Sequence, residues 1–244
     1  TKTEMMESIQ FYKPLNSSVT QARVLLVGPV GVGKSSFFNS INSVFRGHVT
    51  SQAISGSSST SLTTQFRTFS VKAGREGKPL PLILCDTMGL EEGVGAGPVI
   101  DDISNILKGH LPDRYQFNPT GPLQSEAHGF CKSPDLKDKI HCVTYVLDAS
   151  KISIMSTKIE EKLKAIRRTV NLMIPQLLLL TKVDEACALV REDVRNVYRS
   201  GYIKELGVPL SCIIPVKNYS EELELDTNTD ILLLSAVVQM LRFV

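Results

Sequence analysis

A glycine-rich turn at residues 28–36 restricts the fold of this chain more than any other feature. The run before it, residues 23–27, is mostly apolar and rich in branched side chains, which is typical of a buried strand. Apolar residues recur at helical spacing after the turn, so a helix is expected to follow. The turn itself is GPVGVGKSS and matches the phosphate-binding pattern G-x-x-x-x-G-K-[ST]. Strand, glycine-rich turn and helix in this order predict a P-loop.

The residues of this loop have separate predicted roles. Backbone N–H groups at a helix N-terminus attract phosphate, and glycine lets the backbone approach it closely. Lys34 is expected to reach the β- and γ-phosphates, and the Ser35 hydroxyl to ligate Mg²⁺. A chance glycine-rich turn is the alternative, but all the fixed motif positions and both flanks are present. The residues predicted to contact the nucleotide here are Gly28, Val30, Gly31, Val32, Gly33, Lys34, Ser35 and Ser36.

Strand and helix patterns alternate along the rest of the chain. Strands are expected within residues 66–74, 79–86, 140–150, 176–184 and 211–219, and helices within residues 99–107, 156–170, 187–200 and 230–243. The first two strands are joined by a turn and predict a hairpin. This alternation predicts a three-layer α/β fold of the P-loop type. Its sheet would be mostly parallel with one antiparallel hairpin strand, and helices would cover both faces.

The 244 residues suit one α/β domain with additions. Residues 1–22 are predicted to form a short helix and a connector, and residues 23–244 the nucleotide-binding domain. Within that domain, residues of about 91–139 lack strong periodicity and predict an irregular insertion.

Composition limits the partners and the compartment. The formal net charge of +2 gives no reason to expect nucleic acid or anionic membrane as a partner, and no apolar run is long enough to span a membrane. Five cysteines without a C-x-x-C pair indicate reduced thiols, so the cytoplasm is expected. His128, Cys131, His141 and Cys142 are residue types that can bind a metal, but their spacing fits no standard zinc pattern.

The segment DTMG, residues 86–89, follows an expected strand about 50 residues after the P-loop. A carboxylate at that strand end would hold Mg²⁺ through water, which is the role predicted for Asp86. The backbone N–H of Gly89 could meet a γ-phosphate. D-x-x-G alone is a weak pattern, so its position after the strand carries the prediction.

The segment TKVD, residues 181–184, follows another expected strand and resembles the guanine-specificity motif of GTPases, [NT]-K-x-D. One carboxylate, that of Asp184, can accept from both the ring N–H and the exocyclic amine of guanine. Lys182 would lie over the base or ribose, and Thr181 belongs to the same motif. A solvated polar turn is the alternative. Asn218, after the last strand, is a candidate for the base-facing loop, although asparagine is also a common turn residue.

The Ser- and Thr-rich segment 47–65 is predicted to be switch I, which carries a threonine for Mg²⁺ and the γ-phosphate. The candidates are Thr60, Thr63 and Thr64, and the sequence does not choose between Thr60 and Thr63 as catalytic and metal-binding residue.

Beyond single motifs, the chain resembles the interferon-induced protein 44 and 44-like family from about Arg23 to Arg242. The segments that carry the resemblance are GPVGVGKSSFFNSINSVFRGHVT, LCDTMGL, DRYQFNP, SPDLKDKIHCV, LLTKVD and LELDTNTDILLLSA. The resemblance implies a GTPase-like domain that an N-terminal TLDc-type region precedes in the full-length protein. It also implies a cytoplasmic, interferon-inducible factor in antiviral defence or growth restraint.

Two departures from small GTPases bear on hydrolysis. Leu90 occupies the position of the glutamine that orients the attacking water. Val30 replaces a P-loop glycine and would crowd the path of an arginine finger. The leading hypothesis is therefore binding of GTP or GDP with Mg²⁺ and slow hydrolysis, accelerated by a nucleotide-dependent homodimer whose surface includes Arg114. The alternatives are a non-enzymatic nucleotide-binding scaffold and an ATP-dependent P-loop enzyme.

Overall fold

The computed structural model describes residues 1–51, 53, 63–74, 77–170, 172–199 and 210–244. The strands are β1 (Ala22–Val27), β2 (Arg67–Lys72), β3 (Pro79–Asp86), β4 (Cys142–Asp148), β5 (Gln176–Thr181) and β6 (Ile213–Pro215). The α-helices are α1 (Lys2–Gln10), α2 (Lys34–Arg46), α3 (Ile100–Lys108), α4 (Thr157–Thr169), α5 (Val183–Ala186), α6 (Ala188–Glu192) and α8 (Thr227–Arg242). Short 3₁₀ helices are η1 (Leu136–Asp138), η2 (Ile152–Ile154), η3 (Val194–Arg199) and η4 (Leu210–Cys212).

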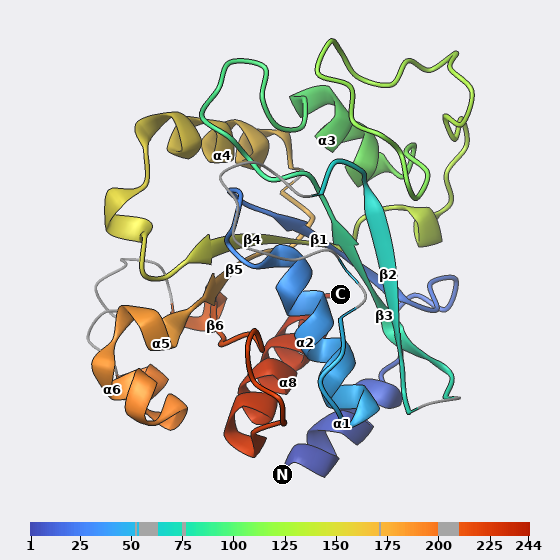
Figure 1. Cartoon of the computed structure of the whole chain (residues 1–244). Coiled ribbons are helices and arrows are strands. Elements are labelled where there is room, and N and C mark those ends of the chain that lie inside the picture. Colours follow the sequence, from blue (N-terminus) through green and yellow to red (C-terminus); the bar gives the residue numbers. More distant parts are fainter. Residues whose placement is uncertain (52, 54–62, 75–76, 171, 200–209) are drawn as a thin grey trace.

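The described strands form one sheet in the order β2-β3-β1-β4-β5-β6 (Figure 1). β1 runs parallel to β3 and β4, β4 to β5, and β5 to β6, whereas β2 is antiparallel to β3. The predicted α/β fold, with its mostly parallel sheet and one antiparallel hairpin strand, is therefore confirmed. Because the parallel strands end at one edge, the loops that follow them converge there.

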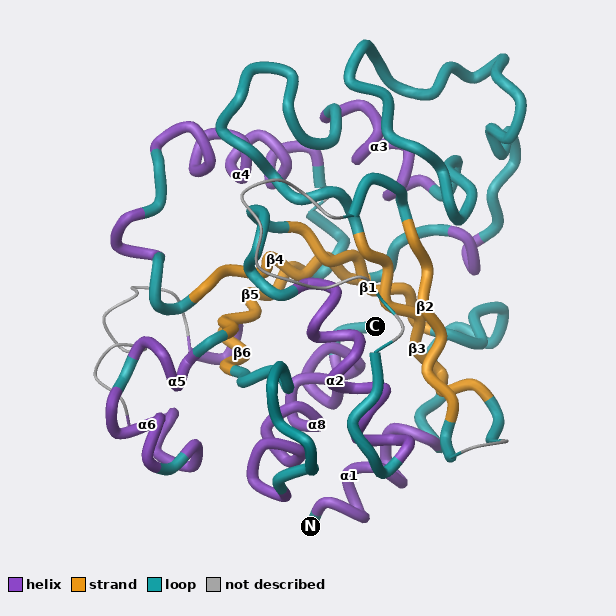
Figure 2. Tube along the Cα trace, in the orientation of Figure 1, coloured by secondary structure: helices purple, strands orange, loops and turns teal. Residues whose placement is uncertain are grey.

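Helices cover both faces of the sheet (Figure 2). Alternate residues of β1 point to opposite faces, as the period of a strand requires. Val24 and Leu26 belong to a core built with α1, α2 and α8, whereas Leu25 and Val27 belong to a second core built with α3 and α4. The apolar α8 is covered by α1, and Ile9 of α1 is fully buried there.

The single helix predicted for residues 187–200 is wrong for the part of the chain that is described. α6 ends at Glu192, and η3 follows it. Asp193 has an extended backbone, and its carboxylate accepts hydrogen bonds from the backbone and guanidinium of Arg195. An aspartate side chain that accepts hydrogen bonds from nearby backbone N–H groups competes with continuation of the helix.

His141 and Cys142, two of the four residues considered as a metal site, have structural contacts within the fold. His141 Nδ1 accepts the backbone N–H of Arg23 at 2.9 Å, and Nε2 lies 2.8 Å from the carbonyl of Leu136. Cys142 is buried in β4. The described residues contain no cluster of three metal-ligating side chains of the His, Cys, Asp or Glu type. No helix in the described ranges is long and apolar enough to cross a membrane.

Candidate nucleotide site

The P-loop connects β1 to α2 at the edge where the parallel strands end. Lys34 is the first residue of α2, and the preceding Gly33 has a φ of 95°, a left-handed conformation that favours glycine. The first N–H groups of a helix have no intrahelical acceptor. Those of α2 start at the end of the loop, so the arrangement can receive an anion such as phosphate.

Lys34 is the buried cation of the loop. Its side chain is 7% exposed, and Nζ donates to the carbonyls of Gly28 at 3.0 Å and Pro29 at 2.9 Å. Burial lowers the pKa of this amine to about 8, although the nearby Asp86 acts in the opposite direction. The ammonium is thus held inside the loop by carbonyl oxygens, which a phosphate could replace.

Three oxygen-bearing side chains from distant segments meet beside Lys34. Ser35 Oγ donates to Asp86 Oδ2 at 2.5 Å and lies 3.3 Å from Thr63 Oγ1. Burial raises the pKa of Asp86, which is 2% exposed, and its Oδ1 atom is buried without a hydrogen-bond partner among the described residues. A hard cation such as Mg²⁺ prefers oxygen ligands of this kind. The predicted metal residues Ser35, Thr63 and Asp86 are therefore brought together, while Thr60 lies outside the described residues.

Two residues predicted for the base side of the site donate hydrogen bonds to carbonyls of the P-loop. Thr181 Oγ1 donates to the carbonyl of Val32 at 2.5 Å. Asn218 Nδ2 donates to the carbonyl of Gly33 at 3.2 Å. Both contacts tie P-loop carbonyls to other parts of the site, namely the end of β5 and the segment that follows β6.

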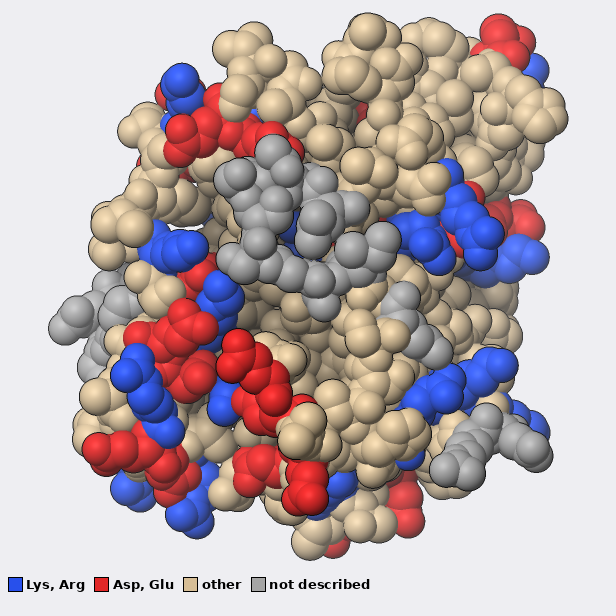
Figure 3. All heavy atoms as spheres, in the orientation of Figure 1, with Lys and Arg blue, Asp and Glu red and all other residues tan. Residues whose placement is uncertain are grey.

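Asp184 lies in the first turn of α5, which begins directly after the carboxyl end of β5. Its Oδ2 atom is 4.0 Å from Nζ of Lys217 and its side chain is 22% exposed, so a ligand can reach it. Lys182 precedes α5 with a φ of 55° and pairs with Asp148 at 3.2 Å. Acidic and basic side chains are mixed on this side of the molecule, over α5 and α6 (Figure 3).

The DTMG segment lies directly against the P-loop. Leu90 N donates to the carbonyl of Gly28 at 3.0 Å, and Val30 N donates to the carbonyl of Leu90 at 3.1 Å. A Cβ atom on Gly89 would lie 2.7 Å from Val30 Cγ2 and 2.9 Å from Val30 Cα, so only glycine fits this approach. The Leu90 side chain is 3% exposed and belongs to the core under α3 and α4. This apolar side chain has no group that could hydrogen-bond a water molecule.

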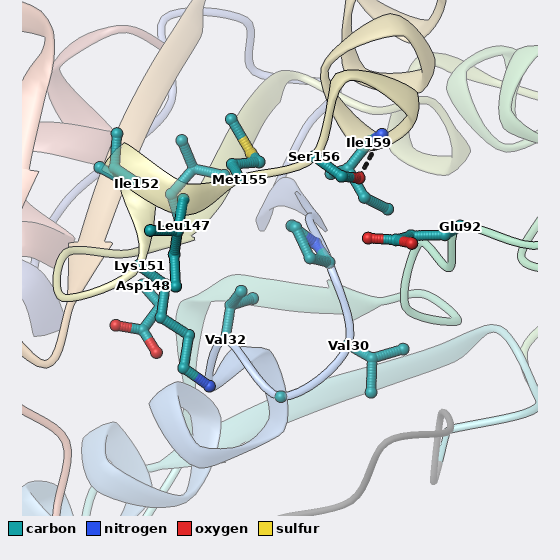
Figure 4. Close-up of a pocket in the computed structure, with 13 residues that line it drawn as sticks. Val30, Val32, Glu92, Leu147, Asp148, Lys151, Ile152, Met155, Ser156 and Ile159 are labelled. Carbon is teal, nitrogen blue, oxygen red and sulfur yellow. Dashed lines mark hydrogen bonds between the residues drawn. The ribbon is translucent and has the colours of Figure 1, made fainter.

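A cavity of about 200 Å³ adjoins the P-loop (Figure 4). Val30 and Val32 line one side of it, and Glu92 lies on the other side from Leu147 (Figure 4). Apolar residues between β4 and the first turns of α4 also line it, and they are Ile152, Ile154, Met155 and Ile159. This cavity separates the P-loop from α4.

Two contributors to the site were missed in the sequence. The amphipathic pattern of α4 predicts that Lys162 faces solvent. Its Nζ atom instead donates to the carbonyls of Glu91, Gly93 and Ala96 in the segment after DTMG. Gln116 of the insertion donates to the carbonyl of Thr64. Neither has a local sequence signal, because both contacts join segments far apart in the chain.

Comparison with known proteins agrees with this geometry. The profile of the family described as 50S ribosome-binding GTPase matches residues 23–182. The chain is 48% identical to human interferon-induced protein 44-like over 99% of its length, and 44% identical to human interferon-induced protein 44 over 98%. It spans 55% and 56% of these two relatives, which is about half of each.

The fold is also that of a solved structure, Toc33 from Arabidopsis thaliana in complex with GDP and Mg²⁺. The TM-score is 0.55 at 14% identity, with 99% of this chain and 91% of that chain covered. The chain therefore belongs to the GTPase family whose profile it matches, and interferon-induced proteins 44 and 44-like are its homologues.

Proposed function

We propose that this domain binds GTP and GDP together with Mg²⁺ and hydrolyses GTP slowly. One observation carries the proposal: Lys34, Ser35, Thr63 and Asp86 meet at the N-terminus of α2, at the sheet edge where the parallel strands end. Membership of a GTPase family supports guanine nucleotide over other phosphate ligands.

Different residues of the chain would bind the phosphates and the Mg²⁺ ion. Lys34 and the amides at the start of α2 would bind the β- and γ-phosphates. Ser35, Thr63 and Asp86 would hold Mg²⁺, which neutralises phosphate charge when bound. The Oδ1 atom of Asp86 supports this fit, because it is buried and has no donor among the described residues, which leaves it open to a cation or water.

Asp184 is the residue proposed to recognise guanine, with Lys182 and Lys217 beside the base. The ion pair of Lys182 with Asp148 would hold its stem at the edge of the site. Thr181 and Asn218 would act on the base indirectly, through the P-loop carbonyls that they bond.

Slow hydrolysis is proposed because the usual water-orienting group is replaced. Leu90 is buried and bonded to the P-loop by its backbone, and Val30 packs against Gly89. The same observation favours one rival, a nucleotide-binding scaffold without turnover. Single-turnover hydrolysis by the wild type and by Lys34→Ala separates the two, because a scaffold would give equal background rates. Competition between GTP and ATP tests the further rival, an ATP-dependent enzyme.

The base contact gives the sharpest test of binding. Asp184→Asn is expected to weaken GTP binding and improve XTP binding, because the amide can donate to the carbonyl that replaces the amine of guanine. Calorimetric titration of both nucleotides measures the preference. Lys34→Ala is the matched control, since it should weaken both nucleotides alike by removing a charge-assisted phosphate contact. An Asp184→Asn variant with the wild-type preference would show that Asp184 does not contact the base.

The function of the whole protein is proposed from its relatives. Their names describe interferon-induced proteins, and we extend to this chain a cytoplasmic, interferon-induced antiviral role and a preceding TLDc-type region.

A nucleotide-dependent homodimer would supply the missing catalytic group, and Arg114, which is 73% exposed, lies on the insertion that could present it. Specific activity that stays constant with protein concentration, with one unchanged mass in GDP and GTP, would remove the dimer.

A further inference from the structure

The insertion contributes a short antiparallel pairing to the end of switch I. Phe66 N donates to the carbonyl of Tyr115 at 2.8 Å, and Arg114 N donates to the carbonyl of Phe66 at 2.7 Å. Phe117 N donates to the carbonyl of Thr64 at 3.2 Å. Together with a bond to the Asp113 side chain, they join residues 113–117 to residues 64–68, which include the first two residues of β2.

Two side chains of the insertion strengthen this pairing. Gln116 Nε2 donates to the carbonyl of Thr64 at 2.9 Å, so that carbonyl accepts from both a side chain and a backbone N–H. Asp113 Oδ1 accepts the backbone N–H of Thr68 at 2.7 Å, and its carboxylate also pairs with Arg67. Both side chains therefore bond the backbone of the segment that leaves the nucleotide site.

The paired segment is itself anchored in the core. Phe66 and Phe117 are 1% and 7% exposed and lie in the same core as Leu90. Tyr115 donates to the buried Asp102 of α3 at 3.1 Å, and Asp102 also accepts the N–H of Leu123 at 3.0 Å. Residues 113–117 are thus fixed to α3 on one side and to residues 64–68 on the other.

We propose that residues 113–117 position Thr63 for the nucleotide, with Asp113 and Gln116 as the positioning residues. This proposal rests on the proposed function, because Thr63 is assigned there to Mg²⁺. Thr63 directly precedes Thr64, and its Oγ1 atom lies 3.3 Å from Ser35 Oγ. A carbonyl held at Thr64 by two donors restricts where the preceding side chain can lie.

The consequence is a difference between GTP and GDP. Switch I of a GTPase is ordered by contacts to the γ-phosphate and Mg²⁺, and it is released on hydrolysis. A segment that is already ordered costs less conformational entropy when such a ligand binds. The insertion should therefore favour the GTP complex, and loosening it should weaken GTP more than GDP.

The test compares two double variants of the same insertion. Asp113→Ala with Gln116→Leu removes both side-chain bonds to residues 64–68, and both side chains are exposed enough to be replaced without opening the core. Glu126→Ala with Gln124→Leu is the matched control. It likewise removes one carboxylate and one amide, from side chains whose hydrogen bonds among the described residues go to Lys132, Ser125 and Pro122. Equal melting temperatures of the two variants would verify that both are folded.

Affinities for Mg²⁺ with a non-hydrolysable GTP analogue, and for Mg²⁺ with GDP, are measured by calorimetry. The first double variant is expected to bind the GTP analogue about fivefold to tenfold more weakly, and GDP less than about twofold more weakly. Its residues 64–68 should also exchange amide hydrogens faster than those of the control. An equal loss for both nucleotides, or no loss, would overturn the positioning role. Wild-type protein that binds neither nucleotide would instead overturn the proposed function on which it rests.

Discussion

At the scale of single residues, Lys34 combines a positive charge with an environment that disfavours it. Burial holds the pKa of its amine at about 8, below the value near 10.4 of a free lysine. Phosphate would add negative charge to that of the nearby Asp86. The charge state of Lys34 and nucleotide binding should therefore depend on each other.

We expect GTP affinity to fall as pH rises from about 7.5 to about 9, because the free protein loses the Lys34 proton that the phosphates require. Binding above pH 8 should take up a proton, which calorimetry in buffers of different ionisation enthalpy measures. Lys34→Arg keeps its charge throughout this range. It should bind more weakly but without this proton uptake, and the same uptake in the arginine variant would assign the titration to another group.

The lowered pKa of Lys34 also predicts how the stability of the nucleotide-free protein changes with pH. Because the folded-state pKa of Lys34 lies below the unfolded value, the unfolded chain binds more protons between pH 8 and about 10.4. The contribution of Lys34 to the free energy of unfolding therefore rises with pH through this window. At neutral pH the buried ammonium lowers stability, so this site is arranged for its ligand at a cost to the empty fold.

At the scale of elements, α4 holds the segment that follows DTMG. Lys162 donates to three backbone carbonyls, those of Glu91, Gly93 and Ala96. The segment is therefore held at two places: Leu90 is bonded to the P-loop, and residues 91–96 are bonded to Lys162. A lysine on the outer part of α4 thus holds the segment that follows the DTMG motif.

Lys162→Met is expected to free residues 91–97, because methionine keeps the stem but cannot donate. Amide exchange in this segment should become faster, and the free energy of unfolding should fall by about 1–2 kcal/mol, since the bonds are partly exposed to water. Lys164→Met on the same helix is the control, because Lys164 is exposed. Equal exchange in the two variants would mean that the core contacts of Leu90 hold the segment alone.

The elements differ in how well the sequence predicts them. Strands such as β1 and β5 and the P-loop are predicted because short-range apolar patterns and a spaced motif determine them. Pairing of residues 113–117 with residues 64–68 is not predicted, because its hydrogen bonds join backbone groups about 50 positions apart and leave no periodic pattern.

The site shows the same division. Ser35 and Asp86 are predicted from motif positions, and the structure places them in contact. Thr181 and Asn218 are also found at the site, but their bonds to P-loop carbonyls depend on the distance between strands and loop, which the motif does not contain. Lys162 is missed because an exposed-looking lysine on an amphipathic helix has the same pattern whether or not it finds carbonyls.

At the scale of the whole molecule, a polar network connects the base-side loop to the helices below the sheet. Tyr219 follows Asn218 in the chain, and its hydroxyl donates to Asp230 Oδ1 of α8 at 2.7 Å. Asp230 is 1% exposed and pairs with Lys2 of α1 at 2.5 Å. Ser40 Oγ of α2 accepts the backbone N–H of Tyr219 at 2.9 Å. The network therefore joins α1, α2 and α8 beside Asn218.

Tyr219→Phe should destabilise the whole fold, because it removes a donor from the buried Asp230 and an acceptor from the backbone N–H of Asp226. Buried polar groups left without partners cost about 1–3 kcal/mol, and about 2 kcal/mol corresponds to a fall of about 4–8 °C in Tm for a chain of this size.

The test of Tyr219→Phe is thermal unfolding with and without GTP and Mg²⁺. Tyr198→Phe is the matched control, since Tyr198 is 53% exposed and its hydroxyl has no hydrogen-bond partner in the described part of the chain. If the network also holds Asn218 against the P-loop carbonyl of Gly33, nucleotide should raise the Tm of Tyr219→Phe by less than it raises that of the control. A lower Tm with an unchanged rise on adding nucleotide would confine the network to stability. An unchanged Tm would mean that Lys2 alone satisfies the carboxylate of Asp230 and that water accepts the backbone N–H of Asp226.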